Sequence, residues 1–189
     1  HILRMKVDLL WNGGIGTYVK ASHQTHRDAG DPSNDNVRIN ADELRCRALG
    51  EGGNLGFTQA GRIEYAMKGG RLDTDAIDNS GGVDMSDHEV NLKILLSSVV
   101  RRGDLEPEAR NAVIASMTEE VTRLVLANSD KHALQLSMDQ IRSHRSPMAF
   151  SRACDWVARH SKVSKSTLDL PSHSELTRRM GHRDGLTRP

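Results

Sequence analysis

The stretch RALGEGGNLGFTQAGRIEYAMKGG, residues 47–70, carries the signals that decide the fold. Residues 47–50 form a short run that predicts a buried strand, and this strand leads into a glycine-rich turn at 51–54. Thr58 is placed to cap a helix through about Lys68, and the glycine pair at 69–70 ends that helix. A strand, a turn and a helix in this order are typical of parallel α/β sheets.

Two similar segments flank this stretch. Residues 6–11 (KVDLLW) predict a strand that stops at the turn 12–14 (NGG). Residues 72–77 predict a third strand, which is followed by a second glycine-rich turn at 78–86. Three strands whose loops follow their carboxyl ends predict an α/β fold with a parallel, doubly wound sheet.

The remaining residues, 87–189, are typical of an all-helical segment. Only three of the sixteen glycines lie beyond residue 82, and apolar residues recur there at helical spacing. We expect this segment to pack on the first part and to extend C-terminally. The expected helices cover residues 87–101, 107–128 and about 130–143, followed by one that begins at Ser146-Pro147 and a short one capped by Ser172.

The composition and the distribution of residues argue against several classes of protein. The 189 residues include 26 Lys+Arg and 25 Asp+Glu, and this balanced charge argues against a protein that coats nucleic acid. No apolar run reaches the roughly 20 residues that span a bilayer, and residues 1–11 lack the features of a secretory signal. Cys46 and Cys154 lie too far apart in sequence for a disulfide framework, so a reducing cytoplasm is expected.

Standard catalytic motifs are missing from the sequence. There is no phosphate-binding P-loop, no H-E-x-x-H zinc helix and no G-x-S-x-G nucleophile elbow. The glycine spacing at 50–56 only approximates a dinucleotide fingerprint. Four potential metal ligands cluster in one polar loop, where a solvated loop is favoured over a metal site: His23, His26, Asp28 and Asp31.

Asparagine accompanies glycine in each of the three expected turns, at 12–17, 51–56 and 78–86. The asparagine amide both donates and accepts hydrogen bonds, which suits a nicotinamide carboxamide and a ribose. One such turn is ordinary turn chemistry, but three turns in register with three strands favour a binding site. Ser86 has two open interpretations: it caps its own helix, or it binds a substrate carboxylate together with the first amides of that helix.

Three long stretches resemble the large, multidomain bacterial NAD-dependent glutamate dehydrogenases. They are DLLWNGGIGTYVKAS (8–22), GEGGNLGFTQAGRIEYAMKGG (50–70) and TDAIDNSGGVDMSDHEVNLKILL (74–96), and the loop GDPSNDNVRIN (30–40) fits the same pattern. The resemblance implies the C-terminal half of a Rossmann-like dinucleotide-binding domain at 1–86, followed by a helical segment at 87–189. It also implies oxidative deamination of L-glutamate to 2-oxoglutarate and ammonia, with NAD as cofactor.

The smaller glutamate dehydrogenases have an E-G-A-N turn and an N-A-G-G-V-x-x-S motif, which resemble residues 51–54 and 79–86. By that likeness Asn54 lies near the nicotinamide ribose, and Asn79 lies near both the nicotinamide and the substrate. The resemblance also implies cofactor contacts at Asn12, Gly13 and Gly14, and a pocket for the substrate side-chain carboxylate lined by Val83 and Ser86. Where the smaller enzymes usually have alanine, this sequence has Gly53 and Ser80, which are small enough to leave room for a ligand.

The catalytic lysine and aspartate of the smaller enzymes, and their first phosphate-binding turn, have no counterpart in this sequence. We therefore expect no catalytic residue and no metal site in this chain, and no activity from it in isolation. The rest of the same polypeptide would supply the missing groups. A homo-oligomer is expected, with no nucleic-acid and no membrane partner.

The alternative is a non-catalytic helical binding or assembly module. The apolar helices expected at 87–101 and 107–128 suggest this second class of function. An exposed apolar patch on these helices would favour assembly, whereas a crevice lined by Asn12, Asn54 and Asn79 would favour the dehydrogenase.

Overall fold

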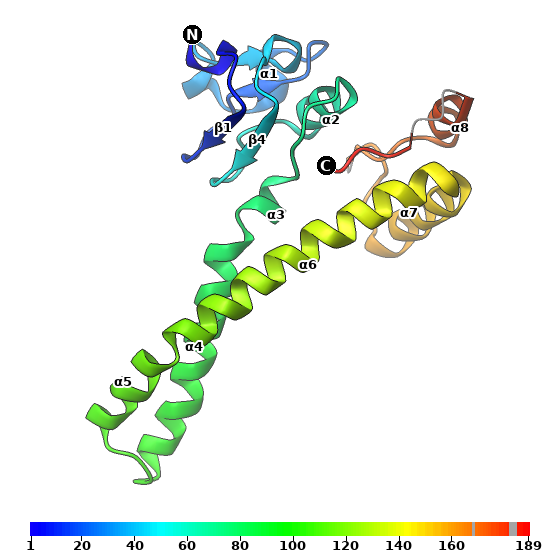
Figure 1. Ribbon diagram of the computed structural model, residues 1–189. Coiled ribbons are helices and arrows are strands. Elements are labelled where there is room, and N and C mark those ends of the chain that lie inside the picture. The colour runs from blue at the N-terminus through cyan, green and yellow to red at the C-terminus, as the bar shows by residue number, and fades with distance from the viewer. Residues whose placement is uncertain (168, 182–184) are drawn as a thin grey trace. The chain divides into compact units, whose positions relative to one another are not determined.

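The computed structural model describes residues 1–167, 169–181 and 185–189 (Figure 1). The chain forms two compact units, one made of His1–Asp75 with Leu134–Pro189 and the other of Ala76–Ala133. Short parallel strands and short helices come first along the chain, and longer helices follow. The fold is therefore mixed α/β, and the domain boundary expected at residue 86 stays a prediction.

The first 75 residues contain four strands in two parallel pairs. In chain order the elements are η1 (Ile2–Arg4), β1 (Leu9–Asn12), β2 (Val19–Lys20), α1 (His26–Ala29), η2 (Pro32–Asn34), β3 (Ile39–Asn40), η3 (Ala41–Glu43), β4 (Ala48–Glu51) and α2 (Gln59–Met67). β1 pairs with β4, and β2 pairs with β3. Single parallel bridges join Val19 to Phe57 and Ala48 to Arg71.

The strands predicted at 6–11 and 47–50 are confirmed with small shifts, since β1 ends at Asn12 and β4 at Glu51. The third predicted strand, at 72–77, is wrong. Pairing there is limited to the bridge at Arg71, and the short helix α3 (Asp75–Asp78) follows. Asp73 and Asp75 instead form ion pairs with arginines elsewhere in the unit, Arg188 and Arg62 respectively.

Local capping fixes α2 as the sequence predicts. The Thr58 side chain accepts a hydrogen bond from the Gly61 amide at 3.1 Å, and Gly69 adopts a φ of +89° just beyond the helix end. Such a positive φ favours glycine, because it has no Cβ to clash with the backbone. The capping box of Asn40 and Glu43 is also present, and it opens the short 3₁₀ helix η3.

A small apolar core holds the strands, α2 and η3 together. Its buried members are Val19, Ile39, Ala41, Cys46, Leu49, Phe57, Tyr65 and Leu72. Most of these side chains are aliphatic, as the low aromatic content of the sequence predicts. The core lies entirely within the first 75 residues, so it positions the turns that follow β1 and β4.

The second unit consists of long helices. α4 (Ser80–Arg101) and α5 (Pro107–Ser116) belong to it, and α6 (Thr118–Arg145) begins in it and continues into the first unit. The break predicted near residue 129 is wrong, because α6 runs through it and the helical break falls at Met117 instead. The polar side chains near the expected break have partners of their own: Asn128 donates to Asp84, and Ser129 to the Val125 carbonyl.

The last helices pack as a pair in the first unit. α7 (Pro147–Ser161) begins at the predicted Ser146-Pro147 step, and α8 (His173–Gly181) follows Ser172, whose hydroxyl accepts from the Glu175 amide at 3.1 Å. Leu176 of α8 and Cys154 of α7 are both buried. The predicted N-terminal positions of these two helices are confirmed.

Candidate functional site

The carboxyl ends of β1 and β4 lie side by side, as parallel pairing requires. Asn12 is the register partner of Glu51, and the Gly52 amide donates to the Asn12 carbonyl at 2.8 Å. The first two predicted turns, at 12–17 and 51–56, therefore start from neighbouring positions at one edge of the sheet. This arrangement confirms the juxtaposition of two of the three expected turns.

The glycines of the second turn make room for β1 and its turn. A Cβ at Gly53 would lie 2.6 Å from the Gly14 carbonyl oxygen, which is backbone and cannot rotate away. A Cβ at Gly52 would lie 2.6 Å from the indole of Trp11, and the same ring lies over Gly50. The spacing that approximates a dinucleotide fingerprint thus reflects close packing of two strands and their turns.

The side chain of Asn12 lies at the centre of this edge. It faces Gly56, where a Cβ would clash with the Asn12 amide nitrogen. Within the described part of the chain, that amide nitrogen is buried and has no hydrogen-bond partner. Asn12 and Gly56 also line a cavity of about 490 Å³ whose other walls include Trp11 and Phe57. Asn12 therefore joins the turn at 12–14 to a cavity of a size that small ligands occupy.

A buried ion-pair network lies directly beneath the second turn. Glu51 is fully buried, and Arg62 of α2 donates to it twice, from Nε at 2.6 Å and from Nη2 at 2.9 Å. Arg62 also approaches Asp75 at 3.3 Å. Burial opposes the charge on Arg62, but its bonds to the two carboxylates outweigh burial and raise the pKa of the guanidinium.

The same network fixes the shape of the turn. Asp75 accepts a hydrogen bond from the Leu55 amide at 2.7 Å, and Leu55 has a φ of +59°, which is uncommon for a residue with a Cβ. Backbone strain of this kind persists only where its surroundings hold it. Neither Arg62 nor Asp75 was found by sequence reasoning, because no local motif pairs residues 51, 62 and 75.

The third predicted turn is different in the structure. Residues 80–86 belong to α4, so Ser86 lies inside the helix and its predicted N-cap position is wrong. Asn79 is the residue before α4, and spacings of four and three residues place Asn79, Val83 and Ser86 along one side of its first turns. Val83 and Ser86 are both exposed. Asn79, Val83 and Ser86 belong to the second unit, whereas Asn12, Gly13, Gly14 and Asn54 belong to the first.

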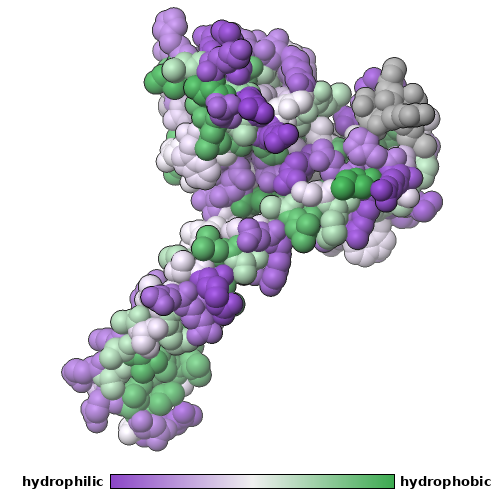
Figure 2. Space-filling model, viewed as in Figure 1, coloured by the Kyte–Doolittle hydropathy of each residue, from purple (hydrophilic) through white to green (hydrophobic). Residues whose placement is uncertain are grey.

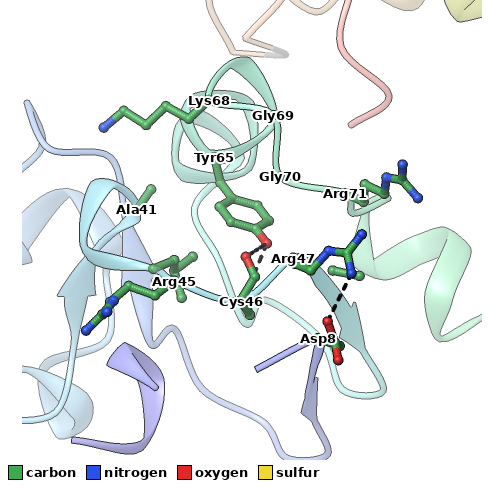
Figure 3. A pocket seen from close by; sticks show the side chains of 12 residues that line it. Asp8, Ala41, Arg45, Cys46, Arg47, Tyr65, Lys68, Gly69, Gly70 and Arg71 are labelled. Carbon is green, nitrogen blue, oxygen red and sulfur yellow. Dashed lines mark hydrogen bonds and ion pairs between the residues drawn. The ribbon is translucent and has the colours of Figure 1, made fainter. Parts of the chain in front are cut away.

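A second cavity, of about 590 Å³, lies at the opposite, amino ends of β1 and β4 (Figure 3). Tyr65 forms part of its wall, and its hydroxyl donates to the Cys46 carbonyl at 2.9 Å. Burial, followed by the contact with Cys46, raises the pKa of this phenol. Sequence reasoning did not single out this cavity, because its lining comes from separate segments.

The described residues show no group of three or more His, Cys, Asp and Glu side chains that could hold a metal ion. Cys46 and Cys154 are both buried free thiols. No helix among the described residues is long and apolar enough to cross a membrane.

Comparison with known proteins identifies the family. The profile of the bacterial NAD-glutamate dehydrogenase catalytic domain matches residues 1–139. The chain is 48% identical over 187 residues to the NAD-specific glutamate dehydrogenase of Pseudomonas aeruginosa, and 47% and 44% identical over 188 residues to those of Halomonas elongata and Mycobacterium tuberculosis. These matches cover 99–100% of this chain and about 12% of each relative. The chain therefore belongs to the bacterial NAD-glutamate dehydrogenase family, and the match lies in the catalytic domain of that family.

Proposed function

We propose that this chain is part of a longer NAD-dependent glutamate dehydrogenase, in which it forms one wall of the cofactor site and one wall of the glutamate site. The observation that carries the proposal is the close contact of the two glycine turns, at Gly53 and Gly14, beside the unsatisfied amide of Asn12. Parallel α/β sheets bind ligands at this edge, outside the carboxyl ends of their strands. We further propose that residues 1–86 are the C-terminal half of a Rossmann-like domain.

NAD fits the residues present at this edge. When bound, the cofactor accepts the hydride from glutamate, and the protein orients the reacting groups. Asn12 lines the cavity at this edge, the turn 12–14 offers backbone that a ligand can approach closely at Gly14, and Asn54 lies exposed on the facing turn. The Glu51–Arg62–Asp75 network keeps the 51–56 turn in one conformation, which is the positioning that such a site requires.

We assign the substrate wall to Asn79, Val83 and Ser86 at the start of α4. Because Ser86 lies inside the helix, its hydroxyl is not needed as an N-cap. Within the described part of the chain it makes no side-chain hydrogen bond, whereas Ser80 and Ser98 of the same helix bond to the carbonyls of Ile77 and Leu95. An exposed hydroxyl that makes no such bond is available to a substrate carboxylate.

The proton-transfer groups and the first phosphate turn would come from the rest of the same polypeptide. The chain spans about 12% of the length of its relative, which agrees with these groups lying elsewhere in the polypeptide. The proposed reaction converts L-glutamate to 2-oxoglutarate and ammonia, and we expect the isolated chain to be inactive. The two free thiols support a place in the reducing cytoplasm.

The replacement Ser86→Ala in the full-length enzyme tests the assignment. Loss of a hydrogen bond to a charged carboxylate costs roughly 1.5–3 kcal/mol, so the KM for glutamate should rise about tenfold or more. The KM for NAD should stay within about twofold. Steady-state kinetics with each substrate varied in turn measures both constants.

Ser98→Ala is the matched control for this measurement. It removes the same hydroxyl from the same helix, about three turns further on, and should leave both KM values unchanged. A glutamate KM that is equal in the two variants would show that Ser86 does not line the substrate pocket.

A second function, assembly, is favoured by the apolar surface of the second unit. Figure 2 shows hydrophobic residues gathered over α4 and α5, and Ile94 and Leu95 are 63% and 60% exposed. We propose that this face joins a second copy of the chain, because large exposed apolar side chains on neighbouring positions are typical of interfaces.

Leu95→Glu should convert an oligomer of the chain to monomer, since a charge at the centre of an apolar interface is strongly unfavourable. Light scattering coupled to gel filtration gives the mass. Val37→Glu, at an apolar side chain that is 53% exposed in the first unit, is the control and should keep the oligomer. A monomeric parent chain would refute the assembly proposal.

A further inference from the structure

The cavity at the amino ends of β1 and β4 is rich in positive charge. Four cationic side chains line it, and Asp8 is the single carboxylate among its lining residues. The cations are Arg45, Arg47, Lys68 and Arg71. In Figure 3, Arg47 and Arg71 extend on one side of Tyr65, and Arg45 and Lys68 extend on the other. The floor of the cavity is thus mainly apolar and includes the Tyr65 ring, and positively charged side chains stand on both sides of it.

The positive charges at this cavity are poorly balanced within the chain. Arg47 pairs with Asp8 at 3.2 Å, but their side chains are 79% and 87% exposed, so water weakens the pair. Lys68 lies 3.3 Å from Glu64 and 4.0 Å from Asp42. Arg45 and Arg71 form no ion pair with any residue in the described part of the chain.

Arg47 and Arg71 are also held close to each other by the backbone. The Arg71 amide donates to the Arg47 carbonyl at 3.2 Å, through the bridge that adds Arg71 to the edge of β4. Both side chains line the cavity, so an anion bound there can reach positive charge from both segments.

The floor of the cavity offers a ligand few hydrogen-bonding side-chain groups. The Tyr65 hydroxyl and the Cys46 thiol lie 3.3 Å apart and bind each other, and both side chains are buried. Gly70 lies against the Tyr65 ring, where a Cβ would clash with the ring. Recognition must therefore come from the arginines on the rim. Arginine presents a planar fork that matches phosphate oxygens.

We propose that this cavity binds a small phosphate-bearing anion with at least two negative charges, held chiefly between Arg47 and Arg71. Arg45 and Lys68 add to the positive potential that attracts it. The site lies at the end of the strands opposite the proposed cofactor site, and it does not depend on the proposed function. A ligand there would contact both the strand end at Arg47 and the segment that follows α2.

Isothermal titration calorimetry of this chain with pyrophosphate, at constant ionic strength, tests the proposal. The expected result is one binding site with a dissociation constant below about 1 mM. Arg47→Ala and Arg71→Ala should each weaken binding about tenfold or more, because each removes a charge-assisted bidentate contact. Arg27→Ala, at an exposed arginine of α1 that does not line the cavity, should bind as the parent chain does.

Nuclear magnetic resonance on the parent chain gives a readout that does not depend on the variants folding. Pyrophosphate should shift the amide signals of residues 45–48 and 69–71 and leave those of residues 12–14 unchanged. The absence of binding, equal affinity in the Arg71→Ala and Arg27→Ala variants, or displacement of pyrophosphate by NAD would each overturn the proposal.

Discussion

Replacing Arg62 by alanine should lower the free energy of unfolding of this chain by about 3–5 kcal/mol, the usual cost of removing one partner from a buried ion pair. The replacement leaves the carboxylate of Glu51 fully buried without its two hydrogen bonds. It also removes a cation that lies 3.3 Å from Asp75. Urea denaturation followed by circular dichroism measures the loss.

Arg47→Ala is the matched control for this experiment. Arg47 also forms an ion pair in the same unit, but the pair is largely exposed, so its removal should have little effect on unfolding. The double variant Glu51→Leu with Arg62→Leu should be more stable than Arg62→Ala, because it removes the buried carboxylate together with its arginine. Equal losses for Arg62→Ala and Arg47→Ala would contradict the account of the network.

The parts of the fold that could be predicted from the sequence are those fixed by neighbouring residues. The helix α2 is an example, because the Thr58 cap and Gly69 lie at its two ends and each acts within one turn. The parallel juxtaposition of the turns at 12–17 and 51–56 also follows from local signals, since parallel strands bring their carboxyl ends to one edge.

The parts that could not be predicted depend on distant partners. Residues 72–77 have a strand-like pattern, but Asp73 pairs with Arg188 and Asp75 with Arg62 and the Leu55 amide. No pattern within a short window reveals an arginine 115 residues away. These long-range pairs decide the conformation of this segment.

The helix α4 begins earlier than its local sequence predicts. Two adjacent glycines at 81–82 favour a turn in isolation, but in the structure they lie in the first turn of the helix. A Cβ at Gly81 would lie 3.8 Å from a methyl group of Val125, so α4 and α6 are in contact at this position. The helix begins before the two glycines, and Ser86 is therefore an interior residue of the helix.

In the candidate site, too, some residues are predictable from the local sequence and others are not. The glycines and Asn12 of the two facing turns could be found from their spacing, because the turns follow strands directly. Arg62 and Asp75, which hold the 51–56 turn from below, could not be found in this way. The conformation of a binding loop is therefore set by charged residues that the loop motif does not contain.

Gly53→Ala should destabilise the chain by roughly 1–3 kcal/mol, the usual cost of forcing an extra carbon into a packed position. The new Cβ would lie 2.6 Å from the Gly14 carbonyl oxygen and 2.8 Å from its carbonyl carbon. Both contacts are backbone atoms, so the two turns must separate. The close approach of the 12–14 turn therefore favours glycine over alanine at this position.

Gly14→Ala is the control for stability, because a Cβ at Gly14 meets no heavy atom within 4 Å. Its unfolding midpoint in urea should stay close to that of the parent chain, while that of Gly53→Ala falls. In the full-length enzyme, Gly53→Ala should also raise the KM for NAD more than the KM for glutamate, because the displaced turn carries Asn54. If the two alanine variants unfold at the same urea concentration, the close contact between the turns does not exist in solution, and the proposed cofactor edge loses its main support.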